Sequence, residues 1–128
     1  MNEHASPIDP AAFERIEQLE SMGARGVIVR VLSAYLSESP ALAARIGAAG
    51  RDGDPADLFH AAHALKSSSA NVGAMTLSHL CQEAETLGRS GTASDAGGVT
   101  AILAEFARVQ EVLQARLVRE QAGARKTK

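Results

Sequence analysis

The stretch DPADLFHAAHALKSSSANVG, residues 54–73, has the pattern of one amphipathic helix with a clear start and a clear end. Asp54 is a good N-cap, and Pro55 takes the first helical position, where its missing N–H costs nothing. Gly73 suits the left-handed conformation that ends many helices. At about 100° per residue, one stripe collects the large apolar side chains. Its members are Leu58, Ala61, Leu65 and Val72. The stretch therefore predicts a helix over 55–72.

Helical spacing of apolar residues recurs along the rest of the chain, and no segment alternates as a half-buried strand would. The pairs Asp9-Pro10 and Ser39-Pro40 repeat the cap signal, so each is expected to begin a helix. A further helix carries Leu77 to Leu87 and ends near Gly88 or Gly91. The expected helices outside 55–72 therefore cover about 10–21, 24–38, 40–49, the segment up to 88 or 91, and 96–120.

These helices predict an all-α fold, namely an antiparallel up-down four-helix bundle with one or two extra short helices at the N-terminus. The 128 residues are enough for one domain with a single core. We expect a flexible N-terminus over 1–9, the bundle over 10–121 and a basic flexible tail over 122–128.

The composition is that of an ordinary globular protein. Apolar residues make up 45% and the net charge is -2, which gives no electrostatic reason to expect nucleic acid. The single cysteine, Cys81, is compatible with a reducing compartment. We see no run of about 18 apolar residues, so no membrane insertion is expected and the cytoplasm is the expected location. One fully used apolar stripe per helix favours a monomer.

His63 lies directly opposite the buried stripe, so its ring is expected to face solvent. A neutral, accessible imidazole is a competent nucleophile near neutral pH. Lys66, one turn further on, offers a cation that can stabilise a phosphoryl group on that ring. The other residues within about 60° on the wheel are mostly small or apolar. They are Ala56, Phe59, His60, Ser67 and Ala70. This surface favours a phosphohistidine.

Three alternatives stay open at this point. The outward Phe59 either belongs to a docking patch or is covered by the N-terminal helix. His63 can be an unmodified surface residue of a bundle that only binds a partner or dimerises. A metal site is the third alternative, since His60 and His63 are three apart on one face, but two ligands do not make a site and no metal is expected.

The motif HALKSSSANVG, residues 63–73, resembles the signature of histidine-containing phosphotransfer (HPt) domains. That signature is H-x-L-K-G-S-S, with a glycine ten positions after the histidine, here Gly73. The resemblance extends to the GD before the 55–72 helix, to LCQEAETLGR at 80–89, and to the spacing of the flanking helices, over about 20–120 in total.

The resemblance implies that His63 accepts a phosphoryl group from the aspartate of one receiver domain and passes it to another. Lys66 matches the family lysine that helps to neutralise that group. Glu85 falls where some members carry a glutamine bound to the histidine ring, and a carboxylate there could accept from Nδ1–H and leave Nε2 to attack. Ser67 replaces the family glycine on the docking face, whereas Ser68 is turned toward the bundle and is expected to be structural.

The implied partners are receiver domains of response regulators, of a hybrid sensor histidine kinase, or of both. Arg89 corresponds to a basic residue near the docking face, which is expected to include Ala56, Phe59, His60 and Ala70 as well. Any Mg²⁺ is expected to come with the receiver, because this chain has no carboxylate cluster near His63. The sequence also lacks a glycine-rich nucleotide loop, so we expect a carrier without kinase activity, either free-standing or a domain of a hybrid kinase.

Overall fold

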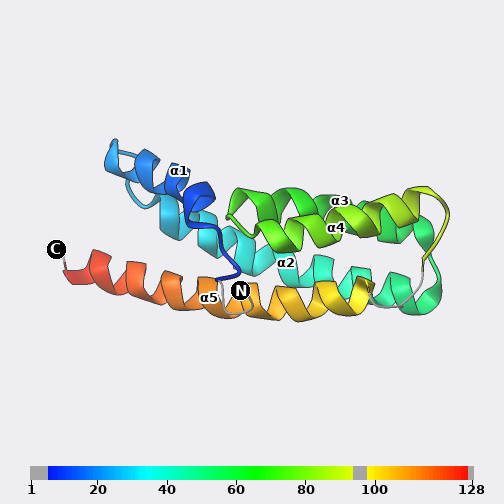
Figure 1. Cartoon of the computed structure of the whole chain (residues 1–128). Coiled ribbons are helices and arrows are strands. Elements are labelled where there is room, and N and C mark those ends of the chain that lie inside the picture. The colour runs from blue at the N-terminus through cyan, green and yellow to red at the C-terminus, as the bar shows by residue number, and fades with distance from the viewer. Residues whose placement is uncertain (1–5, 94–97, 127–128) are drawn as a thin grey trace.

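The computed structural model describes residues 6–93 and 98–126, and these residues form five helices and no strand. The helices are α1 (Pro10–Ser21), α2 (Val27–Asp52), α3 (Pro55–Asn71), α4 (Met75–Arg89) and α5 (Gly98–Lys126). Helices α2 to α5 run alternately in opposite directions, and α1 lies at one end of the assembly (Figure 1). The predicted all-α, antiparallel four-helix bundle with a short N-terminal helix is confirmed.

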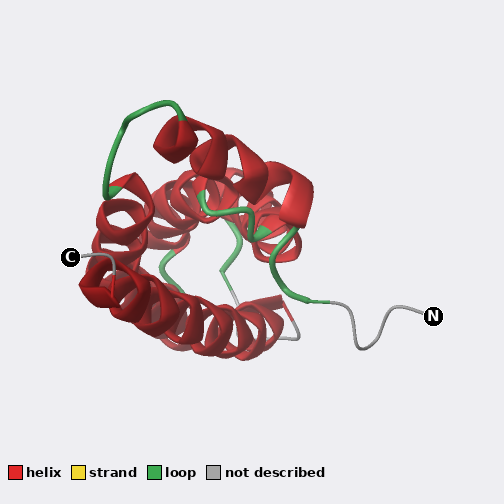
Figure 2. Ribbon diagram, turned by 90° about the vertical axis from the view of Figure 1, so that its left-hand side faces the viewer, coloured by secondary structure: helices red, strands yellow, loops and turns green. Residues whose placement is uncertain are grey.

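The core lies between the four long helices. α2 packs against α3 and α5, α4 packs against the same two helices, and α1 contacts α2 and α3. Seen from the end, the helices surround a common centre (Figure 2). The apolar stripe predicted for α3 is at most 1% exposed throughout, which confirms it. Large aliphatic side chains that are fully buried come from each long helix: Leu32, Ile46, Leu58, Leu65, Leu77, Ile102 and Leu113.

Two of the predicted helix starts and one predicted end are present. The Asp9 carboxylate accepts from the N–H of Ala11 at 3.0 Å, and the Asp54 carboxylate accepts from the N–H of Asp57 at 3.1 Å. Gly73 follows α3 with a φ of +83°, the left-handed conformation that its sequence position indicated. The capping residues at both ends of α3 therefore determine where this helix begins and ends.

The predicted break at Ser39-Pro40 is wrong, because α2 continues through this pair with Pro40 in its interior. A proline inside a helix costs about 3 kcal/mol, since a backbone hydrogen bond is lost and the ring crowds the preceding turn. Leu32 before the proline and Ile46 after it are both fully buried in the same core. Each such side chain contributes about 1.5–3 kcal/mol, so burial on both sides keeps the helix continuous.

The start of the described chain differs from the flexible segment expected over 1–9. Within it, Ile8 is buried, and the N–H of Asp9 donates to the carbonyl of Gly73 at 2.7 Å. These contacts attach residues 6–9 to the turn between α3 and α4. Residues 1–5 lie outside the described residues.

α5 continues to Lys126, past the end expected at residue 120 and into the tail predicted over 122–128. Near this end the Arg116 guanidinium pairs with Glu17 of α1 at 2.9 Å and with Glu120 at 2.7 Å. It also lies 4.8 Å from the centroid of the Phe13 ring. These contacts connect the last turns of α5 to α1. The expected start at residue 96, like residues 127–128, lies outside the described residues.

α2 is also long and apolar enough to span a membrane by length and composition alone, with a mean hydropathy of 1.2 over 18 residues. This test averages hydropathy, and α2 still contains no unbroken run of about 18 apolar residues, since Arg30, Glu38 and Arg45 interrupt it. The core helix of a bundle passes the same test, and in this chain α2 packs against α3 and α5.

Gly88 of α4 lies where the backbones of α3 and α4 come close together. A Cβ atom at this position would lie 2.7 Å from the carbonyl oxygen of Pro55 and 2.8 Å from the backbone nitrogen of Phe59. Both are backbone atoms, so they could move aside only if α3 itself moved. The absence of a side chain at Gly88 therefore sets the spacing between the two helices.

We predict that Gly88→Ala lowers the free energy of unfolding by about 1–2 kcal/mol, because two backbone contacts under 3.0 Å put the overpacking cost at about 2–3 kcal/mol, against a gain of about 1 kcal/mol in helix propensity. Urea denaturation followed by circular dichroism measures the change. Gly123→Ala in α5 is the matched control, since its Cβ would meet nothing within 4 Å. A Gly88→Ala protein as stable as the wild type would contradict this view of the helix contact.

Candidate functional site

His63 stands on the outward face of α3 with 59% of its side chain exposed. The ring faces solvent as predicted, because the stripe on the opposite face of α3 is fully buried. Lys66 follows three residues later and is only 25% exposed. The two basic side chains lie on the same side of α3, next to α4, as helical neighbours three residues apart do.

Glu85 of α4 joins the basic side chains of this surface. Its side chain is 3% exposed, and Oε2 lies 3.2 Å from His63 Nδ1. Oε1 lies 2.7 Å from Lys66 Nζ, and Arg89 Nη2, one turn along α4, lies 3.0 Å from Oε2. One buried carboxylate therefore holds three basic groups, and the structure brings His63, Lys66, Glu85 and Arg89 together as one cluster.

The charge of Glu85 determines which nitrogen of His63 is free. The Lys66 ammonium, and less strongly the hydrogen bond with His63, hold the pKa of the Glu85 carboxyl below its ordinary value, although burial acts in the opposite direction. An ionised carboxylate only accepts hydrogen bonds, so the nitrogen that faces it, Nδ1, carries the hydrogen. In a neutral ring Nε2 is then the unprotonated nitrogen and is available as a nucleophile.

Phe59 contacts two of the basic side chains that surround Glu85, namely His63 and Arg89. Its ring stacks on His63 with centroids 6.1 Å apart and an interplanar angle of 18°, and the Arg89 guanidinium lies 5.5 Å from its centroid. His60 meets the same ring edge-on at 5.1 Å. The N-terminal helix does not cover Phe59, because the chain around α1 packs near Gly73 at the other end of α3. Phe59 is half-buried and borders the site.

The three consecutive serines of α3 divide between the surface and the interior. Ser67, one turn after His63, is exposed, as Ala56 and His60 are. Ser68 is half-buried and donates to the carbonyl of Leu65 at 3.3 Å, which agrees with a structural role. Ser69 is fully buried, and its hydroxyl lies 2.9 Å from the hydroxyl of Tyr35 in α2. Only the first serine therefore shares a face with His63.

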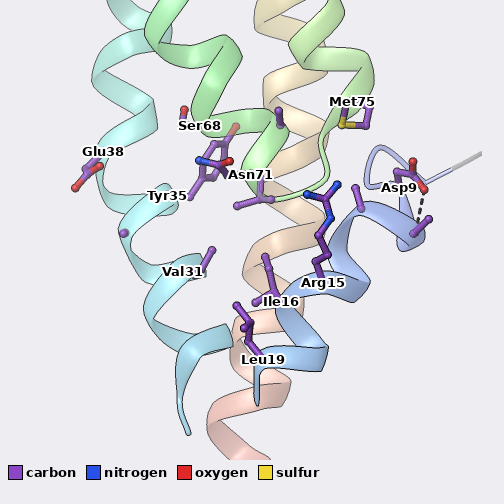
Figure 3. Close-up of a pocket in the computed structure, with 15 residues that line it drawn as sticks. Asp9, Arg15, Ile16, Leu19, Val31, Tyr35, Glu38, Ser68, Asn71 and Met75 are labelled. Atoms are coloured by element: carbon purple, nitrogen blue, oxygen red, sulfur yellow. Dashed lines mark hydrogen bonds between the residues drawn. The ribbon is translucent and has the colours of Figure 1, made fainter. Parts of the chain in front are cut away.

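A groove of about 840 Å³ lies beside α1, α2 and the C-terminal end of α3. Figure 3 shows Ile16 of α1 and Val31 of α2 on its opposite walls. Ala70, one of the predicted docking residues, also lines it, whereas His63 does not. The candidate nucleophile therefore stands on the open surface of the bundle and outside this groove.

The metal alternative gains no support in the described part of the chain. No three histidine, cysteine, aspartate or glutamate side chains lie close enough there to hold an ion. Cys81 is buried, and burial raises the pKa of its thiol to about 12, so it stays protonated.

Gln82 of α4 is part of the cluster and was not singled out from the sequence. Its Oε1 accepts from Lys66 Nζ at 2.9 Å. The available signal was its position three residues before Glu85, which puts both side chains on neighbouring parts of one helix face. Ser78 is a second such residue, since its hydroxyl donates to the backbone carbonyl of Lys66 at 3.1 Å. Both contacts tie α3 to α4 at Lys66.

Comparison with known proteins agrees with this geometry. The Hpt domain family matches residues 30–116. Among solved structures, histidine-containing phosphotransfer protein B from Pseudomonas aeruginosa PAO1 is similar, with a TM-score of 0.73 and 25% sequence identity, over 90% of this chain and 97% of that one. A comparison with curated proteins gave no match.

We predict a pH signature for Glu85. Since its pKa is lower in the folded chain than the ordinary value of 4.5, its contribution to stability is complete above pH 4.5 and is lost as pH falls through the lowered pKa. Below that pH, the unfolding free energy of Glu85→Gln should fall less steeply than that of the wild type in urea titrations. Glu83→Gln, an exposed carboxylate of the same helix, is the control and should follow the wild type. Identical slopes for Glu85→Gln and the wild type would contradict the prediction.

Proposed function

The chain belongs to the Hpt domain family, and from this premise we propose that it is a phosphoryl carrier of a multistep phosphorelay, with His63 as the phosphoacceptor. The carrier takes the group from the aspartyl phosphate of one receiver domain and passes it to another. One observation carries this assignment to His63: an exposed imidazole whose Nδ1 lies 3.2 Å from the buried Glu85 carboxylate, an arrangement that leaves Nε2 as the nitrogen for attack.

The proposed transfer begins with attack of the His63 Nε2 lone pair on the phosphorus of the aspartyl phosphate. An N–P bond forms, the P–O bond to the receiver aspartate breaks, and that carboxylate leaves with the electron pair. The ring then carries a positive charge and keeps its Nδ1 hydrogen, which it donates in a hydrogen bond to Glu85. The carboxylate thus stabilises the charged ring without taking its proton. The same steps in reverse pass the group to the next receiver.

The remaining residues are proposed to supply charge and a docking surface. Phosphoryl transfer depends mainly on positioning and charge neutralisation, and Lys66 lies close enough to contribute a cation. The receiver supplies Mg²⁺, and the carrier needs no cofactor or kinase activity of its own. The proposed docking surface contains Ser67 with Ala56, Phe59, His60, Ala70 and Arg89.

The partners are proposed to be receivers of response regulators, of a hybrid sensor histidine kinase, or of both. Neither nucleic acid nor a membrane is part of this proposal. A cytoplasmic monomer fits it best, because both receivers must reach the same exposed face in turn.

We predict that incubation with a phosphorylated receiver domain and Mg²⁺ gives the wild-type chain an acid-labile, alkali-stable phosphate. His63→Gln should take up none, because the amide has no nucleophilic nitrogen, and ATP alone should label neither protein. Radiolabel transfer resolved on neutral gels measures this. Circular dichroism checks that the variant is folded. A wild-type chain that binds receivers but stays unlabelled would make the bundle an interaction module instead.

We predict that Ser67→Leu abolishes transfer and leaves the far-ultraviolet circular dichroism unchanged. The larger side chain would stand one turn from His63 on the exposed face, where the receiver must approach. Ser37→Leu, at an exposed position of α2, is the matched control and should transfer at the wild-type rate. Normal transfer by Ser67→Leu would remove Ser67 from the docking surface.

A further inference from the structure

Lys66 is not free in the unphosphorylated chain. Its ammonium forms an ion pair with Glu85 Oε1 at 2.7 Å and donates a hydrogen bond to Gln82 Oε1 at 2.9 Å, so both of these partners lie on α4. The side chain is 25% exposed. An ammonium has three hydrogens, so Lys66 can turn more than one of them toward a phosphoryl group on His63 only when one of these partners releases it. The strength of the two contacts therefore bears directly on the proposed transfer.

Gln82 is oriented toward Lys66 by Thr86. The Thr86 hydroxyl donates its single hydrogen to the backbone carbonyl of Gln82 at 3.0 Å. Toward the Gln82 side chain this hydroxyl can then only accept, and the amide Nε2 donates to it at 3.4 Å. The amide nitrogen is thus turned to Thr86 and the amide oxygen to Lys66. Gln82 is exposed, so solvent can replace this contact when Lys66 leaves.

We propose that Gln82 is a positioning residue, which holds the Lys66 ammonium beside Glu85 in the resting carrier and releases it to the phosphoryl group on His63. The inference rests on the proposed function. The role of Gln82 requires an uncharged hydrogen-bond acceptor for the Lys66 ammonium. Glu85 already supplies one carboxylate, which His63 and Arg89 share with Lys66.

The neutrality of Gln82 decides how readily Lys66 is released. A phosphoryl group carries about 1.5–2 negative charges at neutral pH and offers three acceptor oxygens. An anionic acceptor adds the attraction of a full negative charge to its hydrogen bond with the ammonium, whereas an amide oxygen offers only a dipole. The phosphoryl group therefore competes well with an amide oxygen for the ammonium. A second carboxylate at position 82 would hold Lys66 in its resting place.

The test is the rate of phosphoryl transfer from a phosphorylated receiver to Gln82→Glu. We expect it to fall about tenfold, because the full negative charge of a second carboxylate attracts the ammonium more strongly than the amide dipole does. Gln114→Glu is the matched control, since it adds the same charge at an exposed position of α5. It should transfer at the wild-type rate. A Gln82→Glu protein that transfers within about twofold of the wild type would overturn the inference, because such a change is within the usual scatter of additive effects.

A double-mutant cycle separates positioning from a merely structural effect. In a Lys66→Met background there is no ammonium to hold, so Gln82→Glu should cause no further loss of rate. A further loss in that background would overturn the inference. The Lys66 ammonium can also be observed directly as a nitrogen–proton correlation by NMR. Its hydrogens should exchange with water faster in Gln82→Ala than in the wild type, and an unchanged exchange rate would again count against Gln82.

These outcomes distinguish the two proposals. If the wild type accepts a phosphoryl group and Gln82→Glu behaves like it, only the role of Gln82 fails. If the wild type accepts none from any receiver, the proposed function fails, and the release step fails with it.

Discussion

The close contact between α3 and α4 at Gly88 is the constraint on which the candidate site depends. With no side chain at that position, the backbone of α4 lies directly against the first turns of α3 near Pro55 and Phe59. One turn earlier on α4, Glu85 is then deep enough to be buried and still near enough to reach His63. A wider spacing would lengthen the contacts of Glu85 with α3 and admit water to its carboxylate.

The buried carboxylate is tolerated because its negative charge is paired with nearby basic groups. An isolated carboxylate would be expensive to bury, whereas Glu85 contacts two cations and one ring nitrogen. Lys66 and Arg89 together exceed the single negative charge of Glu85, so these three side chains have a net positive charge. This surplus suits an anionic group on the ring. The same carboxylate thus orients the imidazole and leaves a cationic surface around it.

The sequence predicted what depends on periodicity within one helix and on local caps. The buried stripe of α3 and the outward direction of His63 follow from the 3.6-residue repeat, and the contact of Glu85 with the ring followed from a family resemblance. Pro40 could not be placed in this way, because burial of core residues on both sides of it overrides the local helix-breaking signal. The roles of Gln82 and Gly88 depend on distances between two helices, which a single-helix pattern does not contain.

The position of His63 outside the groove between α1 and α2 affects the lifetime of the proposed phosphohistidine. The His63 side chain is 59% exposed in the described part of the chain, so a phosphoryl group on it, as proposed, would meet bulk water between encounters with receivers. Hydrolysis of the phosphohistidine would then compete with its encounter with a receiver. In the proposed relay, the concentration of receiver domains would then determine how much of the phosphorylated protein transfers its group before hydrolysis.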